Sequence, residues 1–297
     1  MMTLLMLKKD ISVTEKDILI PGGTLAGLEF GKGNSERVLA LHGWLDNASS
    51  FIPMMKQAHE KFHWISIDFP GHGHSFRRPP GAFYHFIDWV PLVEQCADVL
   101  EWESFHLLGH SMGAGVASLA AGVLGDRIKT LNLIEGLGPL TSKAEEAPNL
   151  MARHLKGLKS LEKNKPRIFS DIGEAAQRLS EVYVGLSAKE LFSLAKRGLR
   201  QVDGGWAWSA DPRLRVTSPL RFTEEQVLSY LRAINIPVSL VLGDKGLSWQ
   251  PEVLSQRMGA INNLVLKRFS GGHHLHMNLA REVYDFVCEH CLGIESV

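Results

Sequence analysis

The strongest constraint on how this chain folds is a serine with a glycine two residues away on each side. Ser111 lies between Gly109 and Gly113, and the preceding run 105–108 is short and apolar, as expected of a buried strand. The following run 114–123 is rich in small helix-forming residues. Only residues without bulk at 109 and 113 let a strand turn directly into a closely packed helix. The sequence therefore predicts a strand, a strained turn that holds the Ser111 hydroxyl forward, and a helix.

A serine on such a turn is a candidate nucleophile, but acyl transfer also needs donors for the developing oxyanion. The backbone amide of Met112, directly after the serine, is the first candidate. A second donor is expected from a loop after an earlier strand. The apolar run 38–41, which ends in His42, Gly43 and Trp44, provides such a loop.

With this loop the chain resembles the α/β-hydrolase fold family over nearly its whole length. The resemblance implies that the Trp44 amide is the second oxyanion donor and that His42 braces the loop instead of acting as the catalytic base. It also identifies the β-rich run that begins at Ile65, and leads into a glycine-punctuated turn up to Ser75, as the fourth strand. Asp68, His72 and His74 follow that strand, and the resemblance implies that they shape a loop near the active site and bind no ion.

The general base should lie late in the chain, because the family order is nucleophile, acid, histidine. The run 264–269 predicts a final strand, and a Ser-Gly-Gly turn leads from it to His273. The family's catalytic histidine normally follows such a glycine, so we expect His273 to be the base. His274 and His276 are close competitors, and His276 is expected to pack or hydrogen bond at the start of the last helix.

The acid departs from the commonest family pattern, in which an aspartate comes three residues after a glycine that ends the seventh strand. Here the run 237–243 ends in Gly243, but the third residue after it is Gly246. Asp244 comes one residue after Gly243, so its side chain should project differently. Glu135 follows the apolar run 131–134 directly, and a charged residue that ends a buried strand needs a partner.

Some family members carry their acid after the sixth strand, among them haloalkane dehalogenases and serine hydrolase-like proteins. The chain resembles the serine hydrolase-like proteins most through 42–47, 68–73 and 276–278. We therefore expect Glu135 to be the acid, with Asp244 as the alternative. A serine nucleophile also sets the chain apart from dehalogenases and epoxide hydrolases of this fold, which use aspartate.

The expected architecture is a mostly parallel eight-stranded sheet flanked by helices, with a helical cap inserted after the sixth strand. The N-terminal core is expected over 1–138, the cap over 139–215, and the rest of the core over 216–297. Two strands around Pro21 predict an antiparallel edge. The predicted strands are 11–20, 24–30, 38–41, 65–67, 105–108, 131–134, 237–243 and 264–269, and the predicted helices are 51–60, 88–100, 112–124, 251–258 and 279–290.

The amino-acid composition limits the classes of binding partner that the sequence supports. Lysine plus arginine equals aspartate plus glutamate at 32 each, so net charge gives no reason to expect nucleic acid or a membrane. The apolar run 1–7 is too short for a signal peptide or span, and its lysines follow it. Three cysteines do not predict a disulfide framework, and 288–291 is expected to pack in a helix and bind no metal. A cytoplasmic monomer or homodimer is the default expectation.

The predicted function is hydrolysis of a carboxylic ester or related acyl bond of a small molecule, with no cofactor and no metal. Thioesterase, lactonase or carbon–carbon bond hydrolase activity, or a catalytically silent ligand-binding protein, are the alternatives. The expected substrate contacts are Trp44, Leu45, His110, Trp206 and Trp208. The paired tryptophans follow Gly204-Gly205, and they either line an acyl pocket or anchor the cap.

Overall fold

The computed structural model describes residues 12–58, 61–161, 163 and 166–294. Residue 11, the apolar run 1–7 and the end of the predicted helix 51–60 lie outside the described residues. Eight strands form one sheet in the order β1-β2-β4-β3-β5-β6-β9-β10. They are β1 (Thr14–Ile20), β2 (Gly23–Phe30), β3 (Glu36–Leu41), β4 (Phe62–Ile67), β5 (Phe105–His110), β6 (Ile128–Ile134), β9 (Val238–Gly243) and β10 (Leu264–Phe269).

The sheet is parallel except at one edge, where β1 pairs antiparallel with β2 and β2 pairs antiparallel with β4. This confirms the predicted antiparallel edge and the mostly parallel eight-stranded sheet. The helices between and after the strands are α1 (Ile52–Met55), α2 (Val90–Val99), α3 (Met112–Leu124), α7 (Glu224–Arg232), α8 (Pro251–Gly259), α9 (Leu275–Asn278) and α10 (Ala280–Leu292).

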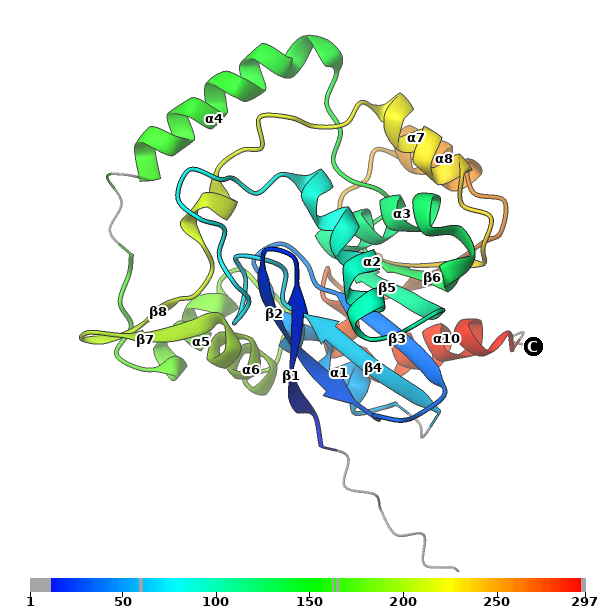
Figure 1. Ribbon diagram of the computed structural model, residues 1–297, viewed down its shortest axis with the longest axis horizontal. Coiled ribbons are helices and arrows are strands. Elements are labelled where there is room, and N and C mark those ends of the chain that lie inside the picture. Colours follow the sequence, from blue (N-terminus) through cyan, green and yellow to red (C-terminus); the bar gives the residue numbers. More distant parts are fainter. Residues whose placement is uncertain (1–11, 59–60, 162, 164–165, 295–297) are drawn as a thin grey trace, which may run out of the picture.

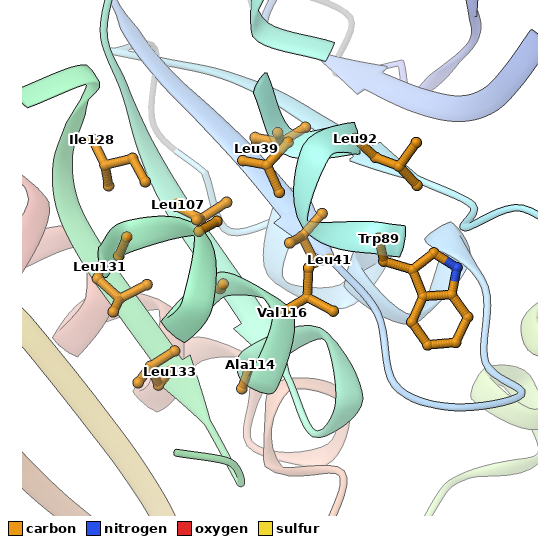
Figure 2. Close-up of a cluster of buried hydrophobic side chains, with 14 of the residues drawn as sticks. Leu39, Leu41, Trp89, Leu92, Leu107, Ala114, Val116, Ile128, Leu131 and Leu133 are labelled. Atoms are coloured by element: carbon orange, nitrogen blue, oxygen red, sulfur yellow. The ribbon is translucent and has the colours of Figure 1, made fainter. Parts of the chain in front are cut away.

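Strand β3 carries buried apolar residues on both faces because helices cover both faces of the sheet. Leu39 and Leu41 of β3 belong to one buried cluster, whereas Val38 and Ala40 belong to the other. Figure 2 shows the first cluster, in which side chains of β3, β5 and β6 lie against helices that carry Leu92 and Val116. The second cluster includes residues of α9 and α10. This alternation accounts for the near-continuous apolar runs in the sequence.

The segment between β6 and α7 is not purely helical. It contains α4 (Ala147–Leu161), α5 (Ile172–Ser180) and α6 (Ala188–Gly198), followed by a hairpin of β7 (Leu199–Val202) and β8 (Gly205–Trp208). Figure 1 shows these elements on the opposite side of the core from α10. The sequence analysis expected no strands here, although Asp203 and Gly204 form the hairpin turn and Gly205 begins β8.

Three buried contacts tie this segment to loops that follow β3 and β4. Arg197 of α6 donates to both carboxylate oxygens of Asp68, at 3.0 and 3.1 Å. Asn47 donates to the carbonyl of Leu194 in α6 at 3.0 Å, and Tyr183 donates its hydroxyl proton to Asp46 at 2.7 Å. Since these loops lie at the carboxyl ends of parallel strands, the segment lies over that edge of the sheet.

Candidate active site

The turn at Ser111 has the strained geometry expected from its glycines. Ser111 lies between β5 and α3, with φ of 54° and ψ of −115°, a backbone conformation that residues with side chains rarely adopt. A Cβ at Gly109 would lie 2.5 Å from the Gly113 carbonyl oxygen, and a Cβ at Gly113 would overlap the backbone of Leu41. The close crossing of strand and helix therefore needs both glycines.

Ser111, His273 and Glu135 form a continuous hydrogen-bonded relay. The Ser111 hydroxyl lies 2.9 Å from Nε2 of His273, and Nδ1 of His273 lies 3.1 Å from Oε2 of Glu135. The serine proton can pass to Nε2 while Nδ1–H donates to the carboxylate. The three residues come from the ends of β5 and β6 and from the loop after β10.

The Glu135 carboxylate is held from two sides. It is buried at the end of β6 and accepts the backbone N–H of Gly243 and of Leu247, each at 2.6 Å. A Cβ at Gly246 would overlap this carboxylate. Gly246 is the position where the commoner family pattern carries its aspartate, and here the missing side chain leaves the space that Glu135 fills.

Asp244 is part of the loop that supports His273. Its carboxylate accepts the N–H of Gly271 at 2.8 Å and the Ser270 hydroxyl at 3.0 Å. These bonds, the one from Gly271 foremost, lower the pKa of Asp244. Within the described part of the chain, His273 Nδ1 hydrogen bonds to Glu135, and no hydrogen bond between His273 and Asp244 is found.

The loop after β3 contains His42 and Trp44. His42 is fully buried and braces this loop: its Nδ1–H donates to the Gly43 carbonyl at 2.7 Å, and its Nε2 accepts the Phe69 N–H at 3.0 Å. Trp44 is 50% exposed, and its indole N–H donates to the Leu214 carbonyl. The next residue, Leu45, is partly buried with φ of 63°.

Met112 is the first residue of α3, so its amide is one of the helix N-terminal donors that have no partner within the helix. An oxyanion near Ser111 would also meet the positive end of the helix dipole.

His110 lies elsewhere than the sequence analysis expected. Its ring has no exposed surface, and Nε2–H donates to the backbone carbonyl of His273 at 2.9 Å. Burial lowers the pKa of His110 to about 4. A fully buried ring under the catalytic loop cannot touch a substrate, so we correct the expected substrate contact to a contact with the loop that carries His273.

The two tryptophans pack within the segment that follows β6. Trp208 makes an edge contact with Phe169 at 5.3 Å between ring centroids, and the backbone of Trp206 pairs with that of Phe169. Both belong to the border of a buried cluster formed by α5, α6 and the hairpin. These contacts give both tryptophans a packing role within the segment itself.

Other histidines and cysteines named by the sequence serve packing. Asp68 accepts the backbone N–H groups of Ala48 and His74 as well as the Arg197 guanidinium. His72 is fully buried, and burial lowers its pKa to about 3. Cys291 lies on α10 against a buried polar network, and burial raises the pKa of its thiol to about 12.

The sequence analysis missed an assembly beside the relay. Asp46 is buried, and its Oδ2 faces Nδ1 of His110 and Nε2 of His274, while Tyr183 bonds its Oδ1. Burial raises the pKa of Tyr183 far above its usual value, which keeps the hydroxyl protonated. No sequence spacing links these residues, because they come from four separate segments.

In the described ranges, no helix is long and apolar enough to cross a membrane.

Comparison with known proteins places this geometry in a family. Residues 36–166 match the family described as alpha/beta hydrolase fold. The chain is 28% identical over 272 residues to a serine hydrolase-like protein of Danio rerio, covering 87% of this chain and 82% of that protein. The crystal structure of a hypothetical protein of Pseudomonas aeruginosa PAO1 matches with a TM-score of 0.85 and 36% identity, over 92% of this chain and 99% of that one.

A thioesterase domain from a curacin biosynthetic pathway matches with a TM-score of 0.83 and 28% identity, over 93% of this chain and 99% of that one. The chain thus belongs to the α/β-hydrolase fold family, as a hydrolase similar to the serine hydrolase-like proteins.

Proposed function

We propose that the protein is a serine hydrolase that cleaves a carboxylic ester, or a related acyl bond, of a small molecule through an acyl-enzyme on Ser111. The observation that carries the proposal is the relay from Ser111 through His273 to Glu135, with contacts of 2.9 and 3.1 Å. In this arrangement the imidazole is within reach of the serine proton, and the carboxylate fixes the tautomer that can accept it.

The proposed reaction has two halves. His273 takes the Ser111 proton as the hydroxyl oxygen attacks the acyl carbonyl, and the resulting imidazolium donates a proton to the leaving group. Water then attacks the acyl-enzyme with His273 as base, which releases the acid and restores the serine. We propose that the backbone N–H groups of Trp44 and Met112 donate hydrogen bonds to the oxyanion.

We further propose that 139–215 acts as a cap over the site. Its contacts with Asp46 and Asp68 hold it to the loops that follow β3 and β4, next to Trp44. Trp44 also bonds the Leu214 carbonyl, near the end of this segment. Trp44 and Leu45 are therefore the proposed contacts for the apolar part of a substrate.

The proposal is tested with p-nitrophenyl esters from acetate to laurate, comparing the native protein with Ser111→Ala. We expect turnover that depends on Ser111, a burst of acyl-enzyme, and covalent labelling of the native protein by a fluorophosphonate. If the native protein is folded yet is neither labelled nor active on any ester, the acyl-enzyme proposal is wrong and ligand binding without catalysis takes its place.

A thioesterase is the second candidate, because the curacin pathway match extends over 93% of this chain. The same experiment separates the two if each acyl group is offered as an ester and as a thioester of matched chain length. A kcat/KM that favours thioesters beyond their greater intrinsic reactivity would select the thioesterase.

A further inference from the structure

Beside the catalytic relay, two imidazole nitrogens converge on one carboxylate oxygen. His110 Nε2 lies 2.9 Å from the His273 carbonyl oxygen, which can only accept a hydrogen bond, so Nε2 carries the proton. Nδ1 of a neutral His110 is then a bare acceptor. It faces Oδ2 of Asp46, a second acceptor, at 3.6 Å, and it has no hydrogen-bond partner among the described residues.

His274 completes the cluster from the other side. Its Nε2 lies 3.5 Å from the same Oδ2 of Asp46. Both distances exceed the usual hydrogen-bond range of about 2.7–3.2 Å. Two ligands of one tetrahedral zinc ion, each at about 2.0–2.1 Å from the metal, lie roughly 3.3 Å apart. These two separations match atoms that share an ion better than atoms that share a proton. The third separation, between the two imidazole nitrogens, lies within 4.8 Å, and binding of an ion would draw those nitrogens closer together.

From this geometry we propose that Asp46, His110 and His274 form a binding site for a divalent transition-metal ion such as Zn²⁺ or Co²⁺. The three ligand atoms, Oδ2, Nδ1 and Nε2, lie within 4.8 Å of one another. Two imidazole nitrogens and a carboxylate oxygen are a ligand set that suits these metals, with a fourth position for water.

The surroundings hold the ligands as second-sphere groups do in metal sites. Tyr183 donates to Oδ1 of Asp46 at 2.7 Å, which turns Oδ2 toward the imidazoles. The His273 carbonyl fixes the His110 ring through Nε2. The His274 side chain is 13% exposed, whereas those of Asp46 and His110 are almost wholly buried. The ion therefore enters from the side of His274.

Metal binding should lower turnover. The His273 ring lies 4.8 Å from that of His110 and 5.2 Å from that of His274, between ring centroids. His273 must become cationic in the proposed reaction, and a nearby divalent cation disfavours that charge. Since no ligand is also the nucleophile, base or acid, we expect kcat to fall with KM unchanged.

The test is titration of the chelator-treated protein with Co²⁺, followed by its visible absorption, and with Zn²⁺, followed by Tm and ester turnover. We expect one Co²⁺ per chain, a higher Tm with Zn²⁺ because the ion binds the folded state, a lower kcat, and reversal by chelator. His274→Gln should weaken binding by more than about tenfold, since loss of even a second-sphere partner costs about 10–100-fold. His290→Gln, a histidine on α10, is the matched control and should bind normally.

Two further variants keep the test decisive. Glu135→Gln should still bind Co²⁺, which separates this site from one at the catalytic histidine. Asp46→Asn should lose binding, and it replaces His274→Gln if that variant fails to fold. The proposal is wrong if the native protein binds no Co²⁺, or if folded His274→Gln and Asp46→Asn bind it as the native protein does. Co²⁺ absorption and Tm need no substrate, so they stand apart from the proposed esterase activity.

Discussion

Glu135 and Asp244 are two carboxylates near the same histidine loop, but they differ in what they bond. Glu135 contacts His273, whereas Asp244 holds the turn that precedes it. We expect Glu135→Gln to lower kcat by orders of magnitude, as an amide in this position fixes the wrong tautomer, a change that costs about 10⁴-fold in a serine triad. Asp244→Asn should change kcat far less, because it keeps an acceptor for the Gly271 amide.

The measurement is kcat for ester hydrolysis, with Tm as the check on folding. The buried carboxylate of Glu135 accepts two backbone N–H groups, and a glutamine can accept only through its oxygen, so some loss of Tm is expected in that variant alone. A large loss of kcat in folded Asp244→Asn, with Glu135→Gln nearly unaffected, would exchange the two assignments.

Gly246 provides a steric test of the same site. Gly246→Ala should lower kcat strongly and reduce Tm, because the new Cβ would overlap the Glu135 carboxylate and push it from His273. Gly259→Ala, at the end of α8, is the matched control, since no heavy atom lies within 4 Å of its added Cβ. If Gly246→Ala keeps native kcat, the carboxylate has room to move and its packed position is unimportant.

At the scale of single residues, the sequence predicts the three residues of the relay but not the buried contacts beside them. Ser111, Glu135 and His273 each follow a strand in the family order, so pattern and order name them as candidates. The contacts in the structure are what distinguish Glu135 from Asp244. Asp46 and Tyr183 are 137 residues apart in the chain, and their contact depends on how the segment after β6 folds back. No periodicity or spacing encodes such a contact.

At the scale of elements, α6 is attached to the core by a buried ion pair. The Arg197 side chain is 6% exposed and bonds Asp68, which has no exposed surface, while its Nη1 reaches the exposed Glu15. Arg197→Met would leave Asp68 with backbone donors but no counter-charge. We expect a loss of about 3 kcal/mol in the free energy of unfolding, since breaking a buried pair costs about 3–5 kcal/mol and the Ala48 and His74 amides still bond Asp68.

Urea denaturation checks this prediction, with Arg178→Met as control. Arg178 pairs with Glu181 on the surface, where ion pairs contribute little. If the two substitutions change the free energy of unfolding equally, the ion pair between Arg197 and Asp68 adds no stability beyond that of a surface pair. Water would then solvate Asp68 as well as the guanidinium does.

The predicted bounds of a helix agree best with the observed ones where contacts with the sheet fix both ends of the helix. The helix predicted at 112–124 is α3 (Met112–Leu124), because the elbow fixes its start and the sheet fixes its face. The helix predicted at 51–60 shortens to α1 (Ile52–Met55), preceded by a 3₁₀ turn at Ala48–Phe51. The β7–β8 hairpin departs from the helical expectation because its strands are four residues each, too short for a clear alternation, and they stay outside the main sheet.

For the molecule as a whole, buried neutral histidines link stability to pH. Burial lowers the pKa of His72 to about 3 and that of His110 to about 4, and it lowers those of His42 and His276 as well. In the unfolded chain each takes up a proton near pH 6.5. Below that pH the unfolded state binds more protons, so stability is full above about pH 6.5 and falls as the pH falls toward the folded-state values.

His72→Phe tests this linkage at one of these positions. Within the described residues neither ring nitrogen of His72 has a hydrogen-bond partner, and the ring makes edge contacts with His42 and Trp89 that a phenyl ring can keep. Removing one proton-binding group should flatten the slope of unfolding free energy against pH by about 1.4 kcal/mol per pH unit well below pH 6.

Urea denaturation at several pH values between about 7 and 4.5 measures that slope, with exposed His74→Gln as the control expected to keep the native slope. If His72→Phe also keeps it, then His72 is protonated to the same extent in both states, and the loss of stability in acid must come from the other buried groups.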